Sequence, residues 1–359
     1  MTPLVVVDAD VLGRQRTGDE TYVENLLRRL PASAGDDFRF AAITRRPDLV
    51  PDGVEPVELK ARFQELRMAA AVPRLLRRLR PALAHFQHAL PLRCPCPAVV
   101  TVHDLSFEFD ANAMGSLDGW IFKRVVPRAA RQARRVIAVS ERTKHDLVTL
   151  YAIPPERIAV IPHGVDSAFG PGANGGHDYL LYVGAIQARK DPIAAAEAAR
   201  TVGLPLVVAG PEREPTLARE LERHGADLRG YVEKDELARL YRGAACLVLP
   251  SRYEGFGLPV LEAMASGTPV VATTAGALPE VAGDAAILVE ERNPVALAGG
   301  IERAIADRDR LRAAGLERAG RYSWAETARR TVEVYRALLN DRAGKAGTAF
   351  SGRRRKRAP

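Results

Sequence analysis

Two glutamates, Glu254 and Glu262, lie eight positions apart in a segment that also contains a glycine-rich turn. Gly255 and Gly257 let the backbone approach a ligand closely or adopt positive φ. Pro259 suits the first turn of a helix, and the free N–H groups there attract anions such as phosphate. The two carboxylates should lie on the order of 10 Å apart, which matches the span from a sugar ring to the ribose of a nucleotide sugar. Because carboxylates accept hydrogen bonds from hydroxyls, each acid could hold one sugar.

The neighbouring residues predict the elements that position this pair. Ala245–Leu249 is a predicted strand that ends at Pro250, and Gly267 fits the position that follows a helix. We therefore expect a strand, a flexible loop and a short helix in succession. On spacing alone, two such glutamates would be surface or capping residues, but the surrounding motif favours a binding role.

Short β-branched runs alternate with helical stretches along most of the chain, which is typical of a parallel sheet covered by helices. Helices are expected at residues 21–30 and 141–151, the second with Ser140 as its N-cap. A Gly-rich stretch, residues 170–178, separates two such halves. The predicted strands are Leu4–Val7, Phe40–Thr44, Ala98–Val102, Val136–Val139 and Ile158–Ile161 before this stretch, and Tyr179–Val183, Pro205–Ala209, Ala245–Leu249, Pro269–Ala272 and Ala286–Val289 after it.

We predict an α/β chain in which two Rossmann-like parallel-sheet domains face a central cleft. In open α/β sheets, ligands bind at the carboxyl ends of the strands, so we expect the chemistry in the loops there. The final helix has Ser323 as its expected N-cap and should cross back to the first domain. The predicted divisions are residues 1–169 and 179–322 for the domains, 170–178 for the linker, 323–340 for the C-terminal helix and 341–359 for a disordered basic tail.

The composition is that of an ordinary globular chain. It has 359 residues, 47% of them hydrophobic and 27% charged, which is about twice the usual size of one domain. No apolar run reaches the ~18 residues of a membrane span, and the start MTPLVVVDAD predicts a first strand rather than a signal peptide. Three cysteines cannot form a disulfide framework, so we expect a cytoplasmic location.

The net charge of +8 is concentrated in a few places. Residues 353–357 carry five positive charges, and without them 47 basic residues face 44 acidic ones. Residues 60–93 carry eight basic residues against the acid Glu65, and residues 123–135 add six basic residues and no acid. Because the body shows no basic stripe with interleaved aromatic residues, nucleic acid is not expected as the main partner.

Residues 62–80 form a predicted helix with an apolar stripe of Val72, Leu75, Leu76 and Leu79, flanked by arginines. Such a helix could rest on an anionic membrane surface, at the inner face of the cytoplasmic membrane. Alternatively, the stripe packs on the chain's own sheet and the basic face is solvated.

His85, His88, Cys94 and Cys96 could be a zinc-binding set, with an HxxH pair followed by CxC. The spacing is unusual for zinc, and the two cysteines lie in a Pro-rich turn. No metal site is therefore predicted.

Residues 251–270, SRYEGFGLPVLEAMASGTPV, resemble the Glu-x7-Glu signature of the retaining nucleotide-sugar glycosyltransferases of family GT4 (glycosyl transferases group 1), which have the GT-B fold. The resemblance extends from about residue 13 to residue 340. Several matched blocks in the right order make it a specific signal. The other markers are 101-TVHDLSF-107, 136-VIAVSERTKHDL-147, 160-VIPHGVD-166, 181-LYVGAIQARKD-191 and 323-SWAETA-328.

The resemblance implies roles for individual residues. Glu262 would bind the ribose hydroxyls, and Glu254 would lie beside the transferred sugar. Arg189 and Lys190 would neutralise the diphosphate, because fixed cations stabilise a leaving group that gains negative charge. His103 would face the reacting sugar from the first domain.

The resemblance also implies a set of donor-binding loops. One departure is that Ala185 follows the glycine of its strand where many relatives have arginine, so the pairing of cations with phosphates stays open. His163 and Gly164 would line the hinge side of the cleft. The implied donor-binding residues are Gly18, Gly184, Gly255, Phe256, Gly257, Leu258 and Glu262.

The activity that the resemblance implies is transfer of a mannose- or glucose-type sugar from a GDP- or UDP-sugar to a hydroxyl of a glycan, glycolipid or lipid-linked acceptor. The anomeric configuration would be retained, and neither a cofactor nor a metal would be needed. No residue is identified as the nucleophile of a covalent intermediate, so we expect front-face substitution. An epimerase-like GT-B enzyme and a non-catalytic nucleotide-sugar binder are the alternatives.

Overall fold

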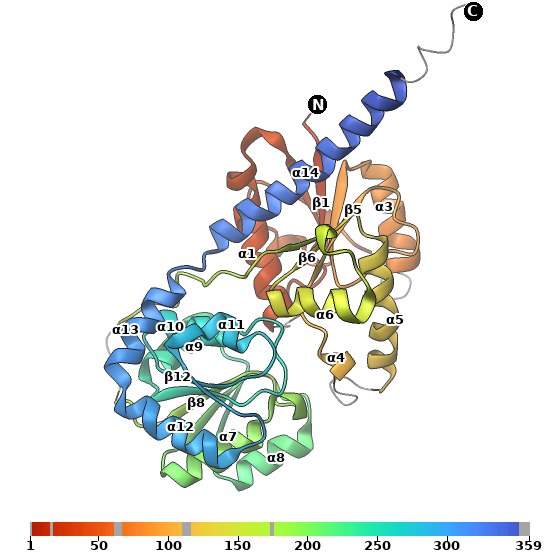
Figure 1. The fold of residues 1–359 in the computed structure, drawn as a ribbon. Helices are drawn as coiled ribbons and strands as arrows, with labels where there is room; N and C mark the ends of the chain where they lie inside the picture. The colour runs from red at the N-terminus through yellow and green to blue at the C-terminus, as the bar shows by residue number, and fades with distance from the viewer. Residues whose placement is uncertain (1, 15–16, 61–66, 110–115, 173–175, 352–359) are drawn as a thin grey trace, which may run out of the picture.

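The computed structural model describes residues 2–14, 17–60, 67–109, 116–172 and 176–351, which form two β-sheets with helices around each (Figure 1). The strands of the first sheet are β1 (Leu4–Asp8), β2 (Arg39–Thr44), β3 (Val54–Glu58), β4 (Leu83–Gln87), β5 (Ala98–Val102), β6 (Arg135–Ala138) and β7 (Ile158–Val160). The strands of the second sheet are β8 (Leu180–Val183), β9 (Leu206–Ala209), β10 (Asp227–Gly230), β11 (Cys246–Leu249), β12 (Val270–Thr273) and β13 (Ile287–Val289).

Both sheets have the same doubly wound strand order over six strands, and the first has one further edge strand, β7. The first runs β3-β2-β1-β4-β5-β6-β7 and the second β10-β9-β8-β11-β12-β13, and every pairing among the described strands is parallel. In each sheet the order reverses beside the first strand, β1 or β8, which is where such sheets bind ligands. This confirms the predicted class of two Rossmann-like parallel-sheet domains.

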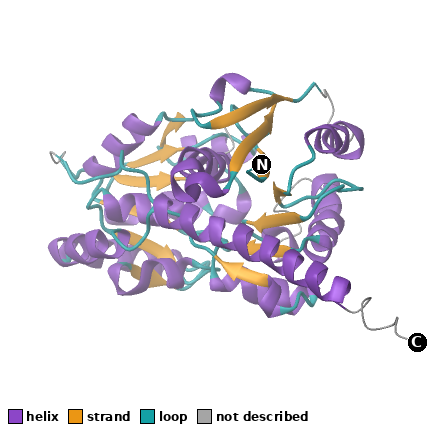
Figure 2. Cartoon of the chain, turned by 90° about the horizontal axis from the view of Figure 1, so that it is seen from above, coloured by secondary structure: helices purple, strands orange, loops and turns teal. Residues whose placement is uncertain are grey.

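Helices cover both faces of the strands, as the view from above shows (Figure 2). Those in the first half are α1 (Thr17–Ala34), α3 (Val72–Leu79), α4 (Ser106–Phe109), α5 (Ser116–Gln132) and α6 (Glu141–Tyr151). Those in the second half are α7 (Pro192–Val202), α8 (Pro215–Arg223), α9 (Lys234–Gly243), α10 (Leu258–Ala265), α11 (Leu278–Ala282), α12 (Pro294–Ala306), α13 (Arg308–Ala319) and α14 (Trp324–Ser351). Helix α6 has the predicted bounds, and the Ser140 side chain accepts a hydrogen bond from the Thr143 N–H as its N-cap.

The final helix, α14, crosses back and packs on α1 of the first half (Figure 1). Its buried residues belong to the same hydrophobic core as those of α1 and β1. At the crossing, a Cβ on Gly164 would lie 2.0 Å from the backbone nitrogen of Trp324, so this close approach requires glycine. The Ser323 hydroxyl accepts a hydrogen bond from the Glu326 N–H at 3.1 Å, which confirms it as the N-cap.

Helix α14 is longer than predicted. It continues past Asn340 to Ser351, whereas a disordered tail was expected from residue 341. Residues 341–351 contain no proline to end the helix, and their three alanines favour its continuation against the opposing preference of Gly344 and Gly347. The five basic residues at 353–357 lie outside the described part of the chain, as do residues 173–175 of the predicted linker.

Three strands, β3, β4 and β10, have no counterpart in the sequence prediction. β3 and β10 are edge strands and carry few β-branched residues; Pro56 fits in β3 because an edge strand pairs on one side only. β4 is central although it contains His85. Both ring nitrogens of His85 are satisfied, by the Tyr335 hydroxyl at 2.6 Å and the Thr101 hydroxyl at 2.7 Å.

The apolar stripe of α3 faces the chain's own core. Val72 and Leu76 are buried, and Leu75 and Leu79 pack against the same core. The alternative in which the stripe packs on the chain's own sheet therefore holds for Val72 and Leu76, whereas Leu75 and Leu79 stay partly exposed and membrane association stays a prediction. The first part of the predicted helix, residues 62–66, lies outside the described residues.

We expect Tyr335→Phe to destabilise the protein by about 1–3 kcal/mol, since the substitution leaves a buried nitrogen of His85 without its partner. Tyr322→Phe is the matched control, because the Tyr322 hydroxyl pairs with Arg318 in a partly exposed position. The two variants are compared by urea unfolding. Equal unfolding midpoints would contradict a structural role for the link between His85 and α14.

Candidate active site

Lys190 and Glu254 form an ion pair at the carboxyl end of the second sheet, in which Glu254 is buried and Lys190 partly buried. The Nζ of Lys190 lies 2.9 Å from Oε1 of Glu254, and the Ser251 hydroxyl donates to the same oxygen at 2.7 Å. Lys190 belongs to the loop after β8, and Glu254 to the loop after β11. Because β8 and β11 are neighbouring parallel strands, their carboxyl ends bring the two loops together.

The charges around Glu254 keep it ionised. Burial by itself would raise the pKa of this carboxyl, but the positive charges of Lys190 and Arg189 outweigh burial and hold the pKa below its ordinary value. A carboxylate held in this way is a weak base. Removing one partner of such a buried pair costs about 3–5 kcal/mol, because the other charge is left uncompensated.

The loop that carries Glu254 meets the first domain through Gly255. A Cβ on Gly255 would lie 1.9 Å from the backbone oxygen of His103 and 2.6 Å from the Cβ of Asp104. The Ser140 hydroxyl donates to the Gly255 carbonyl at 2.7 Å. Only glycine permits this approach, which brings the loops after β5 and β11 into contact at the domain junction.

His103 is a buried, neutral imidazole at this junction. Its Nε2 lies 3.1 Å from Oε1 of Gln87, and its Nδ1 lies 3.4 Å from Nε2 of His163. The ring of Tyr22 packs edge-on against it at 4.7 Å between centroids. Burial lowers the pKa of His103 to about 4. The structure therefore brings the predicted residues His103 and Glu254 to one place, on loops that touch.

Arg189 also bridges the two domains. One of its guanidinium nitrogens donates to the Tyr253 carbonyl at 3.2 Å, and another lies 3.9 Å from Oδ2 of Asp104. Arg189 and Lys190 thus follow one strand and reach the same loop of β11. No cation can come from position 185, where the alanine carbonyl accepts a hydrogen bond from the Tyr182 hydroxyl at 3.2 Å.

The loop before α10 is shaped by glycine and buried side chains. Gly257 has φ of 103°, and a Cβ there would lie 2.7 Å from Cδ2 of Leu278. The Phe256 ring is buried and packs edge-on against His163 at 4.9 Å, so its side chain serves packing. Leu258 is partly buried against the cores of both halves. What this segment offers a ligand is the backbone and the start of the helix.

Glu262 lies in α10 in a different electrostatic environment from Glu254. The Tyr241 hydroxyl donates to its Oε2 at 2.8 Å. Burial raises the pKa of Glu262 to about 7, and the negative charge of Asp166 adds to the rise, against the opposing effects of Tyr241 and Lys234. The two motif glutamates thus differ in charge state near neutral pH.

The two remaining predicted glycines differ in what requires them. Gly184 lies against Gly210. A Cβ on Gly210 would be 2.0 Å from the Gly184 carbonyl oxygen, so the loop after β8 is tightly packed. A Cβ on Gly18 would meet no described atom within 4 Å. Packing does not require glycine at position 18, and its role at the donor phosphates stays a prediction.

A charged cluster at the end of β1 was not predicted. Arg67 pairs with both Asp8 and Asp10, and all three side chains are buried. Arg45 binds Asp10 through two hydrogen bonds of 2.9 Å each, and Arg14 also pairs with Asp10. The sequence signal that could have predicted this cluster was the pair of acids, Asp8 and Asp10, at the end of the apolar run in VVVDAD. The cluster anchors the loop between β1 and α1.

The four residues of the disfavoured zinc set do not form one site in the described structure. His85 binds Tyr335 and Thr101 as described above, and the sulfur atoms of Cys94 and Cys96 lie 3.9 Å apart. His88 lies instead beside His103, with 5.2 Å between the ring centroids.

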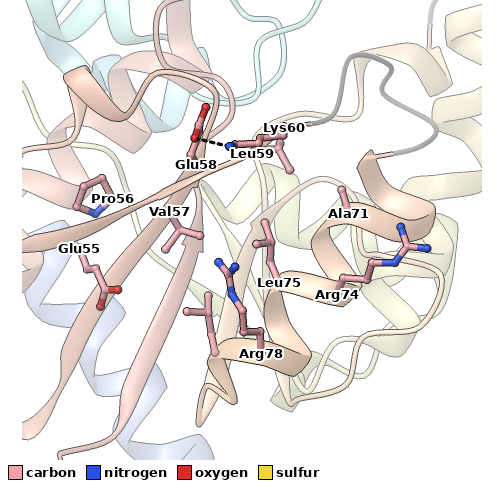
Figure 3. Close-up of a pocket in the computed structure, with 11 residues that line it drawn as sticks. Glu55, Pro56, Val57, Glu58, Leu59, Lys60, Ala71, Arg74, Leu75 and Arg78 are labelled. Atoms are coloured by element: carbon pink, nitrogen blue, oxygen red, sulfur yellow. Dashed lines mark ion pairs between the residues drawn. The ribbon is translucent and has the colours of Figure 1, made fainter.

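A surface groove lies between β3 and α3 (Figure 3). Leu75 and Val57 point into it, Arg74 and Arg78 come from the helix, and Glu58 comes from the strand. None of its lining residues belongs to the predicted site. The mixed charges along its walls do not favour an anionic ligand.

Two Rossmann-like domains, whose loops meet around a buried glutamate, a lysine and a histidine, define a two-domain GT-B protein. Two family models match consecutive parts of the chain: Glycosyltransferase Family 4 over residues 16–169 and Glycosyl transferases group 1 over residues 166–321. The chain therefore belongs to the GT4 glycosyltransferases with the GT-B fold, as the Glu-x7-Glu motif predicted.

Similar curated proteins agree with this family. The D-inositol 3-phosphate glycosyltransferase of Kineococcus radiotolerans is 32% identical over 259 residues, which are 60% of this chain and 60% of that protein. The O-antigen chain mannosyltransferase B of Escherichia coli is 28% identical over 269 residues, or 67% of this chain and 70% of that protein. The match to the first relative thus spans less than two thirds of its length.

Solved structures share the fold over nearly the whole chain. The sucrose-phosphate synthase of Thermosynechococcus elongatus superposes with a TM-score of 0.79 and 22% identity, covering 95% of this chain and 100% of that one. Anabaena HepE, solved in complex with UDP and glucose, has a TM-score of 0.72 and 16% identity, covering 94% and 100%. Within the described residues, no helix is both long enough and apolar enough to cross a membrane.

We expect Glu262→Gln to change how stability depends on pH. The folded carboxyl has a pKa of about 7, above its unfolded value, so the native protein loses stability as pH rises from about 4.5 through 7. A glutamine side chain has no ionisable proton, so the variant does not lose stability in this way as the pH rises. The variant should therefore gain on the order of 2 kcal/mol relative to the wild type between pH 5 and pH 8.

The measurement is chemical unfolding of both proteins at a series of pH values. Glu302→Gln, at an exposed position of α12, is the control and should show no such relative gain. A constant difference between Glu262→Gln and the wild type across this range would contradict the raised pKa.

Proposed function

We propose that this chain is a retaining glycosyltransferase. It moves a mannose- or glucose-type sugar from a GDP- or UDP-sugar to a hydroxyl of a glycan, glycolipid or lipid-linked acceptor. The observation that carries the proposal is the Lys190–Glu254 ion pair. The loop of Glu254 touches the backbone of His103 through Gly255. Two cations, a carboxylate and an imidazole thus meet at the carboxyl ends of two sheets, where α/β folds bind ligands.

In the proposed reaction, the bond between the anomeric carbon and the diphosphate oxygen breaks. The acceptor oxygen forms the new bond on the same face of the sugar, and its proton passes to the departing diphosphate oxygen. Lys190, Arg189 and the N–H groups at the start of α10 stabilise the negative charge that grows on the diphosphate. These groups supply the charge stabilisation that a metal ion gives in other enzymes, so the proposed reaction is metal-independent.

Glu254 acts in this scheme by position and charge. Its Oε1 accepts hydrogen bonds from Lys190 and Ser251, and its lowered pKa makes it a poor base. A fixed negative charge beside the sugar stabilises an oxocarbenium-like state without attacking it. His103, neutral and held by Gln87, faces the sugar from the other domain.

Glu262 binds the ribose in this proposal. Hydroxyl groups that donate to a carboxylate favour its ionised form. Because the pKa of unliganded Glu262 is about 7, part of the population is protonated at neutral pH. Donor binding should therefore release a proton from this residue.

The choice of donor and acceptor rests on the similar proteins. One relative is described as a mannosyltransferase of the O-antigen chain, and one structural neighbour was solved with UDP and glucose. The first supports a mannose-type sugar and a glycan acceptor, and the second supports UDP as the nucleotide; GDP stays the other candidate. A thermal-shift panel of GDP-mannose, UDP-glucose and ADP-glucose identifies the donor, because at equal concentration the ligand that binds most tightly stabilises the folded state most.

With the donor identified, Glu254→Gln should lower turnover by about 10²–10³-fold, because a preorganised charge beside the reacting carbon is lost. Glu302→Gln is the matched control and should keep wild-type turnover. Turnover is measured as nucleoside diphosphate release with candidate acceptors. Full activity of Glu254→Gln would contradict the proposed role of Glu254 in stabilising charge. A trapped glycosyl–protein adduct would contradict front-face substitution.

The same assay separates the alternatives. An epimerase-like enzyme converts the donor without an acceptor, whereas a transferase requires one. A non-catalytic binder gives a thermal shift with one donor but no product under any condition.

An exposed apolar and basic surface on α5 fits a lipid-linked acceptor. Trp120 and Ile121 are 57% and 37% exposed, and the Arg124 guanidinium stacks on the Trp120 ring at 3.8 Å. Leu92, 64% exposed, is tied to this helix by a 2.9 Å hydrogen bond from Arg128 to its carbonyl. Aromatic and basic side chains together favour the interface of an anionic membrane.

We expect the double variant Trp120→Ser/Ile121→Ser to bind anionic vesicles several-fold more weakly than the wild type. Val295→Ser removes another exposed apolar side chain, 82% exposed on α12, and should bind like the wild type. Co-sedimentation with phosphatidylglycerol vesicles at low salt measures both. Equal binding of all three proteins would contradict a membrane role for this surface.

A further inference from the structure

Three side chains from separate segments converge beside His103. Asp19 comes from the first turn of α1, His88 follows β4 and His103 follows β5. One ligand atom from each residue lies within 4.8 Å of the other two, and Nε2 of His88 is 4.0 Å from Oδ1 of Asp19. The function proposed above uses His103 but neither Asp19 nor His88.

The backbone at His88 is held in an unusual conformation. Its φ of 55° lies in the left-handed region, which a residue with a side chain seldom adopts. The backbone N–H of His88 donates to the Thr101 carbonyl at 2.9 Å, so this conformation is fixed by the neighbouring strand β5. The other ring nitrogen of His88, Nδ1 rather than the Nε2 that lies 4.0 Å from Asp19, is buried and has no hydrogen-bond partner among the described residues. Strain of this kind accumulates at ligand sites.

The spacing of the three groups suits a transition metal. Zinc binds histidine nitrogen and carboxylate oxygen at about 2.0–2.2 Å, so ligand atoms in a tetrahedral site lie about 3.3 Å apart. Contraction from the present separations requires side-chain movements on the order of 1 Å. Both ring nitrogens of His103 have partners, Gln87 at Nε2 and His163 at Nδ1, so one of these two contacts must give way to the ion and the other remains as an outer-shell partner.

We propose that Asp19, His88 and His103 bind Zn²⁺, with the fourth coordination position open, and that the bound ion blocks donor turnover. Two imidazoles and one carboxylate favour zinc over magnesium, which prefers oxygen ligands in octahedral geometry. The inhibitory part rests on the proposed function, in which His103 faces the reacting sugar. The binding part depends only on the three side chains.

The test uses untagged protein in which Cys94 and Cys96 are replaced by serine, because this half-buried thiol pair could bind zinc independently. Equilibrium dialysis against Zn²⁺, followed by elemental analysis, should give one ion per chain. His88→Gln should weaken binding by about tenfold or more, as expected for loss of a ligand. His145→Gln removes an exposed histidine on α6 and should bind zinc like its parent.

Asp19→Asn is a second test of the same site if His88→Gln does not fold, because the Asp19 side chain is 37% exposed and tolerates an isosteric change. Co²⁺ in place of Zn²⁺ adds a visible absorption spectrum, which should be lost in both variants. Equal zinc binding by the parent, His88→Gln and Asp19→Asn would overturn the site.

Inhibition is measured separately, by donor turnover at increasing Zn²⁺. The parent should be inhibited over the concentration range in which it binds zinc, and Asp19→Asn should need about tenfold more zinc for the same inhibition. If one Zn²⁺ binds per chain but turnover is not inhibited, the inhibitory role is overturned and the metal site itself stands. If no donor is turned over at all, the proposed function fails, while dialysis and the Co²⁺ spectrum still decide the metal site.

Discussion

The contact between Gly255 and His103 is the constraint on which the rest of the site depends. The two backbones approach so closely that any side chain on Gly255 would collide with the first domain. Around this contact, the Ser140 hydroxyl binds the Gly255 carbonyl, and Glu280 of the second half accepts hydrogen bonds from the N–H groups of Glu141 and Arg142 at the start of α6. The free N–H groups at the start of a first-domain helix are thus satisfied from the second domain. These contacts hold the loops after β5 and β11 in a fixed position relative to each other.

Burial has opposite consequences for the two motif glutamates. Glu254 is surrounded by cations, so its pKa falls although it is buried. Glu262 has a tyrosine hydroxyl as its hydrogen-bond partner and a nearby negative charge, so burial dominates and its pKa rises to about 7. One residue therefore supplies a permanent charge, whereas the other gains its charge most readily when hydroxyl groups bind it. The pair is unlike an acid and a base that exchange a proton.

Helix α14 packs against the histidines of the first domain. Trp324, at the start of α14, packs against His163 with 5.4 Å between ring centroids, and His163 packs against His103 at the same distance. Tyr335 of the same helix binds His85 in the central strand β4. Since α14 also covers α1, the last described helix completes the core of the first domain. Trp324, His163 and His103 therefore form one packed group of rings.

Much of the fold was predictable because the central strands are short β-branched runs and the helices begin at recognisable caps such as Ser140 and Ser323. Edge strands such as β3 and β10 were missed because they need little hydrophobic patterning. β4 was missed because its buried His85 becomes acceptable only when Tyr335, 250 residues away, supplies a partner. A local pattern carries no information about such distant partners.

The sequence by itself determined the family, the parallel-sheet architecture and the identity of the motif residues, because the Glu-x7-Glu segment combines glycines, a proline and two acids that a strand–loop–helix unit requires. Only the tertiary structure decided that Lys190 pairs with Glu254, that Arg67 is buried against Asp8, and that His88 joins Asp19 and His103 rather than the cysteines. The reason is physical. Charge state and ligand geometry depend on which side chains share a buried volume, and parallel strands bring together loops that lie far apart in the chain.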